Sequence, residues 1–193
     1  MQLKNEGLIL QTDTNNERYV LFDEQDGKIF AKINNPKKIN YFSGLFISYS
    51  HETINDRLKL KNIEIEFAPT NTSASDINFL HLILELCNLF LPEGQENSDI
   101  YRLVKDIFVH KNIINIKYVK KIILCQFFFK LGIIPEKVII NSFFKTIMHI
   151  PIDRIKELEI DLNIDRLLNN WIIYGIKSHP NAQKLKTVRF FEL

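Results

Sequence analysis

Hydrophobic and polar positions alternate over the first third of the chain in short segments typical of β-strands. Polar clusters and an Asp26-Gly27 turn signal separate these segments. The predicted strands cover residues 7–12, 18–22, 28–33, 45–49 and 58–67. In the third segment, alternation separates an apolar face from a face of two lysines and one phenylalanine.

The last predicted strand contains a change of phase. Leu58 and Leu60 keep one alternation, whereas Ile63, Ile65 and Phe67 keep the opposite one. A slip of one residue near Lys61-Asn62 is what a β-bulge produces, and bulges let a short sheet bend and close. Five short antiparallel strands with a bulge therefore predict a small closed barrel, of which the five-stranded OB-fold is the commonest form.

After Pro69 the hydrophobic period changes to about 3.6 residues, which predicts helices. The sequence predicts them at about 77–91, from Ser98, at about 116–131 and after an Asn163 cap, with short helices broken at Pro151 between 137 and 160. The predicted buried stripe of the second comprises Ile100, Leu103, Val104, Ile107 and Phe108. That of the last comprises Ile164, Leu167, Leu168, Trp171 and Ile172, with Gly175 closing the helix.

The expected class is thus α+β, with an OB-fold barrel over residues 1–68 and an all-α helical domain over residues 69–193. Cys87 and Cys125 lie within apolar helical patterns, which favours buried thiols in a reducing compartment. No signal-peptide pattern and no apolar run long enough to span a membrane is found in the sequence. A cytoplasmic protein is therefore expected.

Motifs of common enzyme classes are absent from the sequence. It contains no phosphate-binding glycine loop, no nucleophile-elbow motif and no His-Glu-x-x-His, and its five histidines occur singly. The acidic stretch Glu157, Glu159, Asp161 and Asp165 has irregular spacing, so a solvated face is favoured over a magnesium site. We expect no catalytic site, cofactor or metal.

Basic residues gather at two places, although the net charge of +2 alone does not indicate a polyanion partner. The first cluster is a candidate DNA-binding face, in which lysines attract phosphates and an exposed ring stacks on a base. It comprises Lys28, Phe30, Lys32, Lys37, Lys38 and Lys59. The alternative is a solvated strand with Phe30 packed against the helical domain. The second cluster, Lys117, Lys120 and Lys121, is a candidate site for an acidic partner, and its alternative is a solvated helix start.

Several strings, in their order, resemble the DNA repair family RecO. They are Gly7-Leu8-Ile9-Leu10-Gln11-Thr12, the Gly27-Lys28 turn with its basic loop, Leu91-Pro92-Glu93-Gly94, and Leu131-Gly132 followed by Pro135-Glu136. The likeness covers residues 7 to about 136. Many members of that family carry a four-cysteine zinc module after the last string, and this chain has no cysteine there.

The resemblance implies an OB-fold that binds single- and double-stranded DNA, with RecR and the acidic C-terminal tail of single-stranded-DNA-binding protein as partners. It implies annealing or recombinase loading in recombinational repair without turnover chemistry. The alternative function is a protein-interaction module whose barrel and helical domain dock an acidic partner segment without binding DNA.

Overall fold

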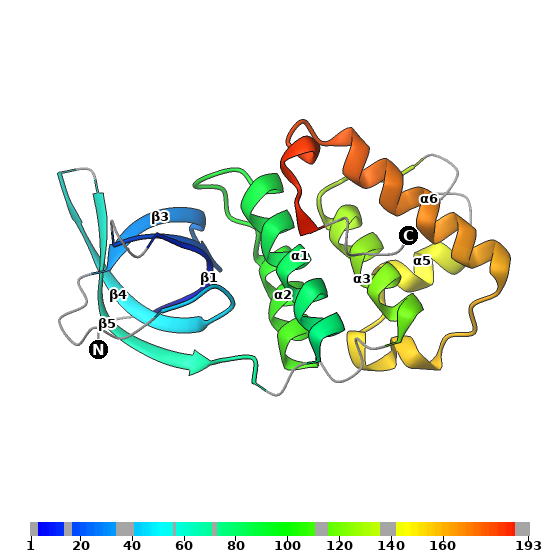
Figure 1. Cartoon of the computed structure of the whole chain (residues 1–193), viewed down its shortest axis with the longest axis horizontal. Helices are drawn as coiled ribbons and strands as arrows, with labels where there is room; N and C mark the ends of the chain where they lie inside the picture. The colour runs from blue at the N-terminus through cyan, green and yellow to red at the C-terminus, as the bar shows by residue number, and fades with distance from the viewer. Residues whose placement is uncertain are drawn as a thin grey trace. The chain divides into compact units, whose positions relative to one another are not determined.

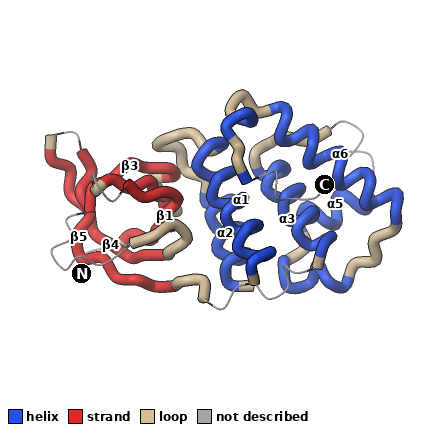
Figure 2. Tube along the Cα trace, in the orientation of Figure 1, coloured by secondary structure: helices blue, strands red, loops and turns tan. Residues whose placement is uncertain are grey.

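Five strands form the N-terminal part of the chain and helices form the rest (Figures 1 and 2). The computed structural model describes residues 4–13, 17–33, 41–55, 57–70, 73–110, 116–135 and 142–187. The strands are β1 (Asn5–Asp13), β2 (Arg18–Asp23), β3 (Gly27–Ile33), β4 (Phe46–Ile54) and β5 (Arg57–Phe67). Each predicted strand is present, and the change of hydrophobic period near Pro69 coincides with the change from strands to helices.

The five strands close into a barrel in the order β1-β2-β3-β5-β4. The pairing of β4 with β1 closes the barrel, and only β3 and β5 run parallel among the named pairs. This order, with its crossover between β3 and β5, is the arrangement predicted as an OB-fold. The α+β class, a closed five-stranded barrel followed by helices, is confirmed.

The predicted bulge in β5 is confirmed. Ser48 pairs with Glu64 and Ser50 pairs with Lys61, so two residues of β5 stand opposite one residue of β4. Asn62 lies in the bulge with a φ of 50°, a left-handed conformation that asparagine tolerates better than most residues. Further register shifts lie between Ile9 and Gln11 in β1 and between Phe46 and Ile47 in β4. These irregularities bend strands that must curve for the barrel to close.

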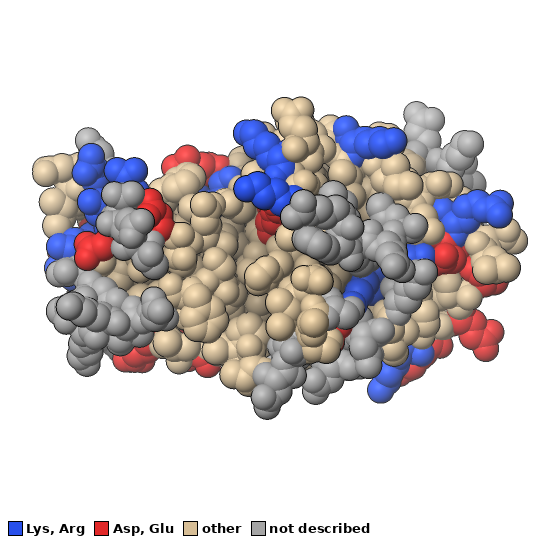
Figure 3. All heavy atoms as spheres, viewed as in Figure 1, with Lys and Arg blue, Asp and Glu red and all other residues tan. Residues whose placement is uncertain are grey.

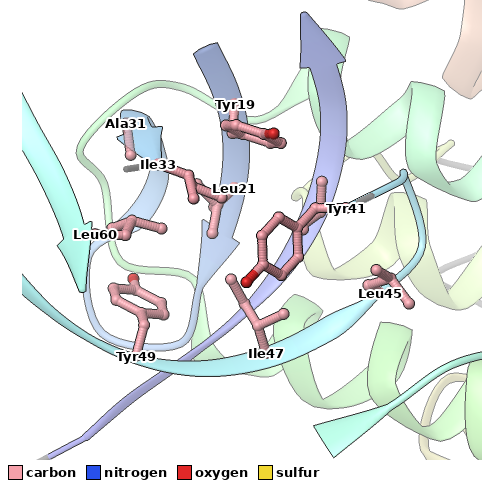
Figure 4. Packing of buried hydrophobic residues seen from close by; sticks show 10 residues of the cluster. Tyr19, Leu21, Ala31, Ile33, Tyr41, Leu45, Ile47, Tyr49 and Leu60 are labelled. Carbon is pink, nitrogen blue, oxygen red and sulfur yellow. The ribbon is translucent and has the colours of Figure 1, made fainter. Parts of the chain in front are cut away.

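The barrel interior is filled by aliphatic and aromatic side chains that point toward one another (Figure 4). Its buried members are Ile9, Tyr19, Leu21, Ala31, Ile33, Tyr41, Leu45, Ile47, Tyr49 and Leu60. Tyr49 donates a 2.5 Å hydrogen bond from its hydroxyl to Asp23 Oδ2, which satisfies a carboxylate that is only 1% exposed. Asp23 Oδ1 accepts from the backbone N–H of Gln25 and Asp26, so the same side chain shapes the β2–β3 turn.

The described helices are α1 (Ala74–Phe90), α2 (Ser98–Val109), α3 (Lys117–Lys130), α5 (Ser142–His149) and α6 (Leu162–Ser178). Two 3-10 helices, η2 (Ile152–Glu157) and η3 (Ala182–Lys184), complete the set. The predicted apolar stripe of α2 is buried throughout. The short helices on either side of Pro151 agree with the predicted break.

Two expectations for α6 are wrong. Its cap is Asp161, whose side chain accepts a 2.8 Å hydrogen bond from the backbone N–H of Ile164, and not Asn163. Gly175 does not end the helix, which continues to Ser178. A side chain at Gly175 would place its Cβ 2.6 Å from the ring of Phe128, so the glycine is required by the close approach of α3 and α6.

The chain divides into two compact units, one of residues 1–71 and 80–102 and the other of residues 72–79 and 103–193. This differs from the single boundary at 68/69 that the sequence predicted. The barrel unit includes the second part of α1 and the first turn of α2. Lys28 on β3 contacts Asn88 and Gly94, and the Tyr101 ring of α2 packs against Phe22 and Phe46. Among the described helices, none is long and apolar enough to cross a membrane.

Candidate nucleic-acid interface

Phe30 is exposed on the outer face of β3. The strand alternates as predicted, with Ala31 and Ile33 buried in the barrel and Phe30 53% exposed. The sequence left this ring either exposed or packed, and the ring is exposed. A single exposed apolar side chain is ordinary, so the meaning of Phe30 depends on the residues around it.

Lys28 is not part of an open cationic face. It is half-buried, and its Nζ donates a 2.8 Å hydrogen bond to the backbone carbonyl of Asn88 in the last turn of α1. Burial lowers the pKa of Lys28, and the neighbouring Glu93 opposes part of that effect. The predicted exposed position of this lysine is therefore wrong, because its ammonium group already has a partner within the barrel unit.

A row of charged residues runs across the strands in register. Arg18 on β2 pairs with Lys32 on β3, and Lys32 pairs with Lys59 on β5. The row continues to Asp13 on β1 and Glu52 on β4, so a carboxylate bounds the three cations at each end. Neighbouring strands are about 4.8 Å apart, which brings the three cations close together on β2, β3 and β5.

Arg57 adds a fourth cation beside this row, because it lies two residues before Lys59 on β5 and so on the same face. We call Arg18, Lys32, Arg57 and Lys59 the basic ladder. No ladder residue forms an ion pair with any other part of the chain that the structure describes. On the barrel, Lys and Arg side chains gather near the end of the β4–β5 hairpin (Figure 3).

Two cavities lie along the basic ladder. The first, of about 520 Å³, is lined by Gln11, Asp13, Arg18, Tyr19, Val20, Phe30, Ala31, Lys32, Arg57, Leu58 and Glu93. The second, of about 530 Å³, is lined by Glu17, Lys32, Ile33, Ile54, Asn55, Arg57, Leu58 and Lys59. The two share Lys32, Arg57 and Leu58, and we call the pair of cavities the barrel groove.

The rim of the second cavity has an unusual backbone. Glu17, before β2, and Asn55, between β4 and β5, are both left-handed, with φ values of 52° and 49°. Non-glycine residues in this region are uncommon and concentrate at turns and binding sites. Loops at these two positions border the binding face of OB-folds. The left-handed residues and the second cavity therefore lie where an OB-fold binds its ligand.

The other predicted residues of the first cluster divide as follows. Lys32 and Lys59 lie in the barrel groove with Phe30. Lys37 and Lys38 lie outside the described residues. Arg18 and Arg57 were missed. Arg18 joins the lysines only through the pairing of β2 with β3. Arg57 shares the face of Lys59 by alternation, but it lies one residue before the predicted start of its strand.

The second predicted cluster is not an exposed surface. Lys120 is 8% exposed, with its Nζ 3.2 Å from Asp76 Oδ1 and 5.8 Å from the centre of the Phe79 ring. Lys121 is 1% exposed and donates to Asp165 Oδ1. The expected open arrangement of these two lysines is wrong, because carboxylates of the same chain occupy both ammonium groups. The side chain of Lys117 lies outside the described part of the structure.

Most of the acidic stretch considered for magnesium has structural contacts. Asp165 pairs with Lys121, Asp161 caps α6, and Glu157 pairs with Arg154. Within the residues that the structure describes, no group of three His, Cys, Asp or Glu side chains is placed to hold a metal ion. Cys87 and Cys125 are buried, and burial raises the pKa of both thiols.

The fold places the chain in the class of α+β proteins with an N-terminal closed barrel and a helical region. No protein-family model matches the sequence, and no curated protein matches it either. Function therefore follows from the barrel groove, its basic ladder and the exposed ring beside them.

Proposed function

We propose that this chain is a non-enzymatic DNA-binding protein whose barrel groove holds single-stranded DNA. We further propose that it acts in recombinational repair by promoting strand annealing or recombinase loading. The observation that carries the proposal is the basic ladder, three rungs of which lie in register on β2, β3 and β5 next to exposed Phe30.

The ladder has the chemistry that a nucleic-acid backbone requires. Cations that neutralise phosphates release condensed counterions, and this release supplies most of the sequence-independent affinity for DNA. The ladder cations make no ion pairs with described residues, so binding a phosphate breaks no such pair. The exposed ring adds a stacking surface of the kind that single-strand-binding barrels use.

The resemblance to RecO supports the more specific role. Two of its strings, the Gly27-Lys28 turn and Leu91-Pro92-Glu93-Gly94, meet in the structure, where Gly94 N donates to the Lys28 carbonyl at 2.9 Å. These strings therefore join the end of α1 to the barrel, and of their residues Glu93 also lines the first cavity. Double-stranded DNA, RecR and the acidic tail of single-stranded-DNA-binding protein remain partners that the resemblance alone proposes.

Nothing in the described residues favours the interaction-module alternative. It relied on Lys117, Lys120 and Lys121 as an open binding site for an acidic segment, and the side chain of Lys117 lies outside the described part of the structure. The other two lysines are buried against Asp76 and Asp165. Breaking such pairs to bind another carboxylate would exchange one partner for another without a clear gain.

Fluorescence anisotropy with a labelled single-stranded oligonucleotide tests the DNA-binding proposal. The double variant Lys32→Glu/Lys59→Glu is expected to bind at least about tenfold more weakly, because it replaces two phosphate contacts by repulsion. The control is Lys156→Glu/Lys177→Glu, which makes the same change of net charge at exposed lysines of η2 and α6. Equal affinity of the two double variants would refute the proposed groove.

Annealing is tested separately by following the pairing of two labelled complementary strands by energy transfer. The wild-type chain is expected to accelerate pairing without a nucleotide cofactor, and the Lys32→Glu/Lys59→Glu variant is expected not to. Binding without acceleration by the wild-type chain would refute the annealing role and leave the DNA-binding role intact.

A further inference from the structure

We infer that the barrel groove accepts DNA only as a single strand, one dinucleotide step at a time. In this arrangement one unstacked base lies on Phe30 in the first cavity. The phosphate that follows it lies between Lys32 and Arg57, and the next nucleotide enters the second cavity. This inference rests on the proposed function and specifies the form of DNA that the groove recognises.

The first cavity suits a base. It contains the exposed Phe30 ring, with Tyr19 and Val20 as further walls, and its volume of about 520 Å³ falls in the range of small-ligand pockets. Asp13 and Glu93 also line it, and their carboxylates repel a phosphate but accept hydrogen bonds from a neutral base. The ring and the mixed polar lining therefore favour the base over the backbone.

The boundary between the cavities suits a phosphate. Lys32 and Arg57 line both cavities, and neither forms an ion pair with a described residue. Arg57 can donate two parallel hydrogen bonds to a phosphate, and Lys32 adds a compact point charge. A phosphate at this boundary has a cavity on either side, which matches the order of base, phosphate and next nucleotide along one strand.

The second cavity continues the path. Lys59 supplies another cation, Ile54 an apolar wall, and Asn55 an amide at the rim. Its single acidic member is Glu17, compared with two acidic members of the first cavity. The backbone of a single strand can therefore leave the first cavity in the direction of Lys59.

A duplex does not fit this arrangement. Its bases are paired and stacked inside the helix, so a base can stack on the Phe30 ring only after it is unpaired and unstacked. Ladder cations can still attract a duplex electrostatically. The Phe30 contribution, however, is available only to a strand whose bases are free.

The test compares three probes of equal length: an oligothymidylate, an abasic strand with the same phosphates, and a duplex. Each is titrated by anisotropy against wild type, Phe30→Ala and Phe30→Trp. The wild type is expected to bind the oligothymidylate about tenfold more tightly than the abasic strand, because stacking on one ring favours each engaged base. Phe30→Ala removes this difference and leaves the affinity for the abasic strand unchanged, whereas Phe30→Trp keeps the difference.

The outcome that overturns the inference is a Phe30→Ala variant that weakens all three probes equally, or a duplex bound as tightly as the oligothymidylate. Equal affinity of the wild type for the oligothymidylate and the abasic strand also overturns it. In each of these cases the effect of Lys32→Glu/Lys59→Glu still decides the proposed function. Because Phe30 is exposed, its replacement is expected to leave the melting temperature unchanged, which separates loss of stacking from loss of fold.

Discussion

Lys28 Nζ on β3 lies 2.8 Å from the carbonyl oxygen of Asn88, in the last turn of α1. The final carbonyls of a helix have no partner within the helix, and a cation at this end also meets the negative end of the helix dipole. Gly94 N returns a hydrogen bond to the carbonyl of Lys28, so the start of β3 is bound to this segment through side chain and backbone together.

Lys28→Met, which keeps the length of the side chain, is expected to lower the free energy of unfolding by about 1–2 kcal/mol. The reason is the loss of a charge-assisted hydrogen bond at a helix end. Lys32→Met on the same strand is the control and should change stability by less than about 0.5 kcal/mol. Urea denaturation measures both. For DNA binding, Lys32→Met should lose more affinity than Lys28→Met. A larger loss in Lys28→Met would contradict a structural role for Lys28 and a DNA-binding role for Lys32.

Gly27 and Gly94 provide a matched test of close packing. Both have left-handed backbones, with φ of 69° and 66°, but a Cβ at Gly27 would lie 1.9 Å from the carbonyl oxygen of Gln95, whereas one at Gly94 meets nothing within 4 Å. Gly94→Ala is expected to cost about 1 kcal/mol of backbone strain. Gly27→Ala should cost several times more, on the order of 3 kcal/mol or above, because it adds a clash with backbone. Similar melting temperatures for the two variants would exclude this packing.

Tyr49 predicts a loss of stability at alkaline pH. Burial raises its pKa, and the hydrogen bond to Asp23 raises it further, so the folded chain retains a proton that the unfolded chain releases near pH 10. Stability should therefore fall as pH rises above about 10, by about 1.4 kcal/mol per pH unit for this group. Tyr101 contributes in the same direction, because burial also raises its pKa.

Tyr49→Phe should make the alkaline decline shallower by that amount. At neutral pH it should cost about 1–3 kcal/mol, since Asp23 Oδ2 loses its donor in a buried position. Tyr174→Phe, at an exposed position of α6, is the control and should change neutral stability by less than about 0.5 kcal/mol. Urea curves between neutral and alkaline pH measure both effects, and an unchanged slope in Tyr49→Phe would be evidence against this origin.

Lys121 and Asp165 form an ion pair that is buried at the lysine. Asp165→Asn removes the countercharge of an ammonium group that is 1% exposed. The cost should be about 3 kcal/mol, at the low end for buried pairs because Asp165 is about one-third exposed. Lys121→Met combined with Asp165→Asn should recover part of this loss, as no buried charge then remains. Denaturation of the single and double variants measures the coupling, and strictly additive losses would refute it.

Much of the barrel could be predicted from the sequence because its signals are local. The alternation of apolar and polar residues predicted the strands. The phase change between Leu60 and Ile63 predicted the bulge in which Asn62 lies. The helices of the C-terminal part were predicted for the same reason. The cap of α6 was misplaced because Asp161 and Asn163 are both good cap residues, and only the backbone decides between them.

The candidate site was only partly predictable because it depends on strand pairing. Lys32 and Phe30 share a face by alternation, but Arg18 joins them only through the register of β2 with β3. Lys28 lies on the same predicted face, but its Nζ binds the carbonyl of Asn88, which is 60 residues away in the sequence. Lys121 shows the same limit, since a lysine at a helix start looks solvated until the helix that carries its aspartate is placed.

The salt dependence of single-stranded DNA affinity tests the central claim most directly. With three to four ladder cations on phosphates, a plot of log affinity against log salt concentration should have a slope of about −2 to −3. Replacing Lys32 by Ala should make that slope shallower by about 0.7, the share of one phosphate contact on a single strand. A slope near zero, or a slope that Lys32→Ala and Lys59→Ala leave unchanged, would contradict DNA binding by the barrel groove.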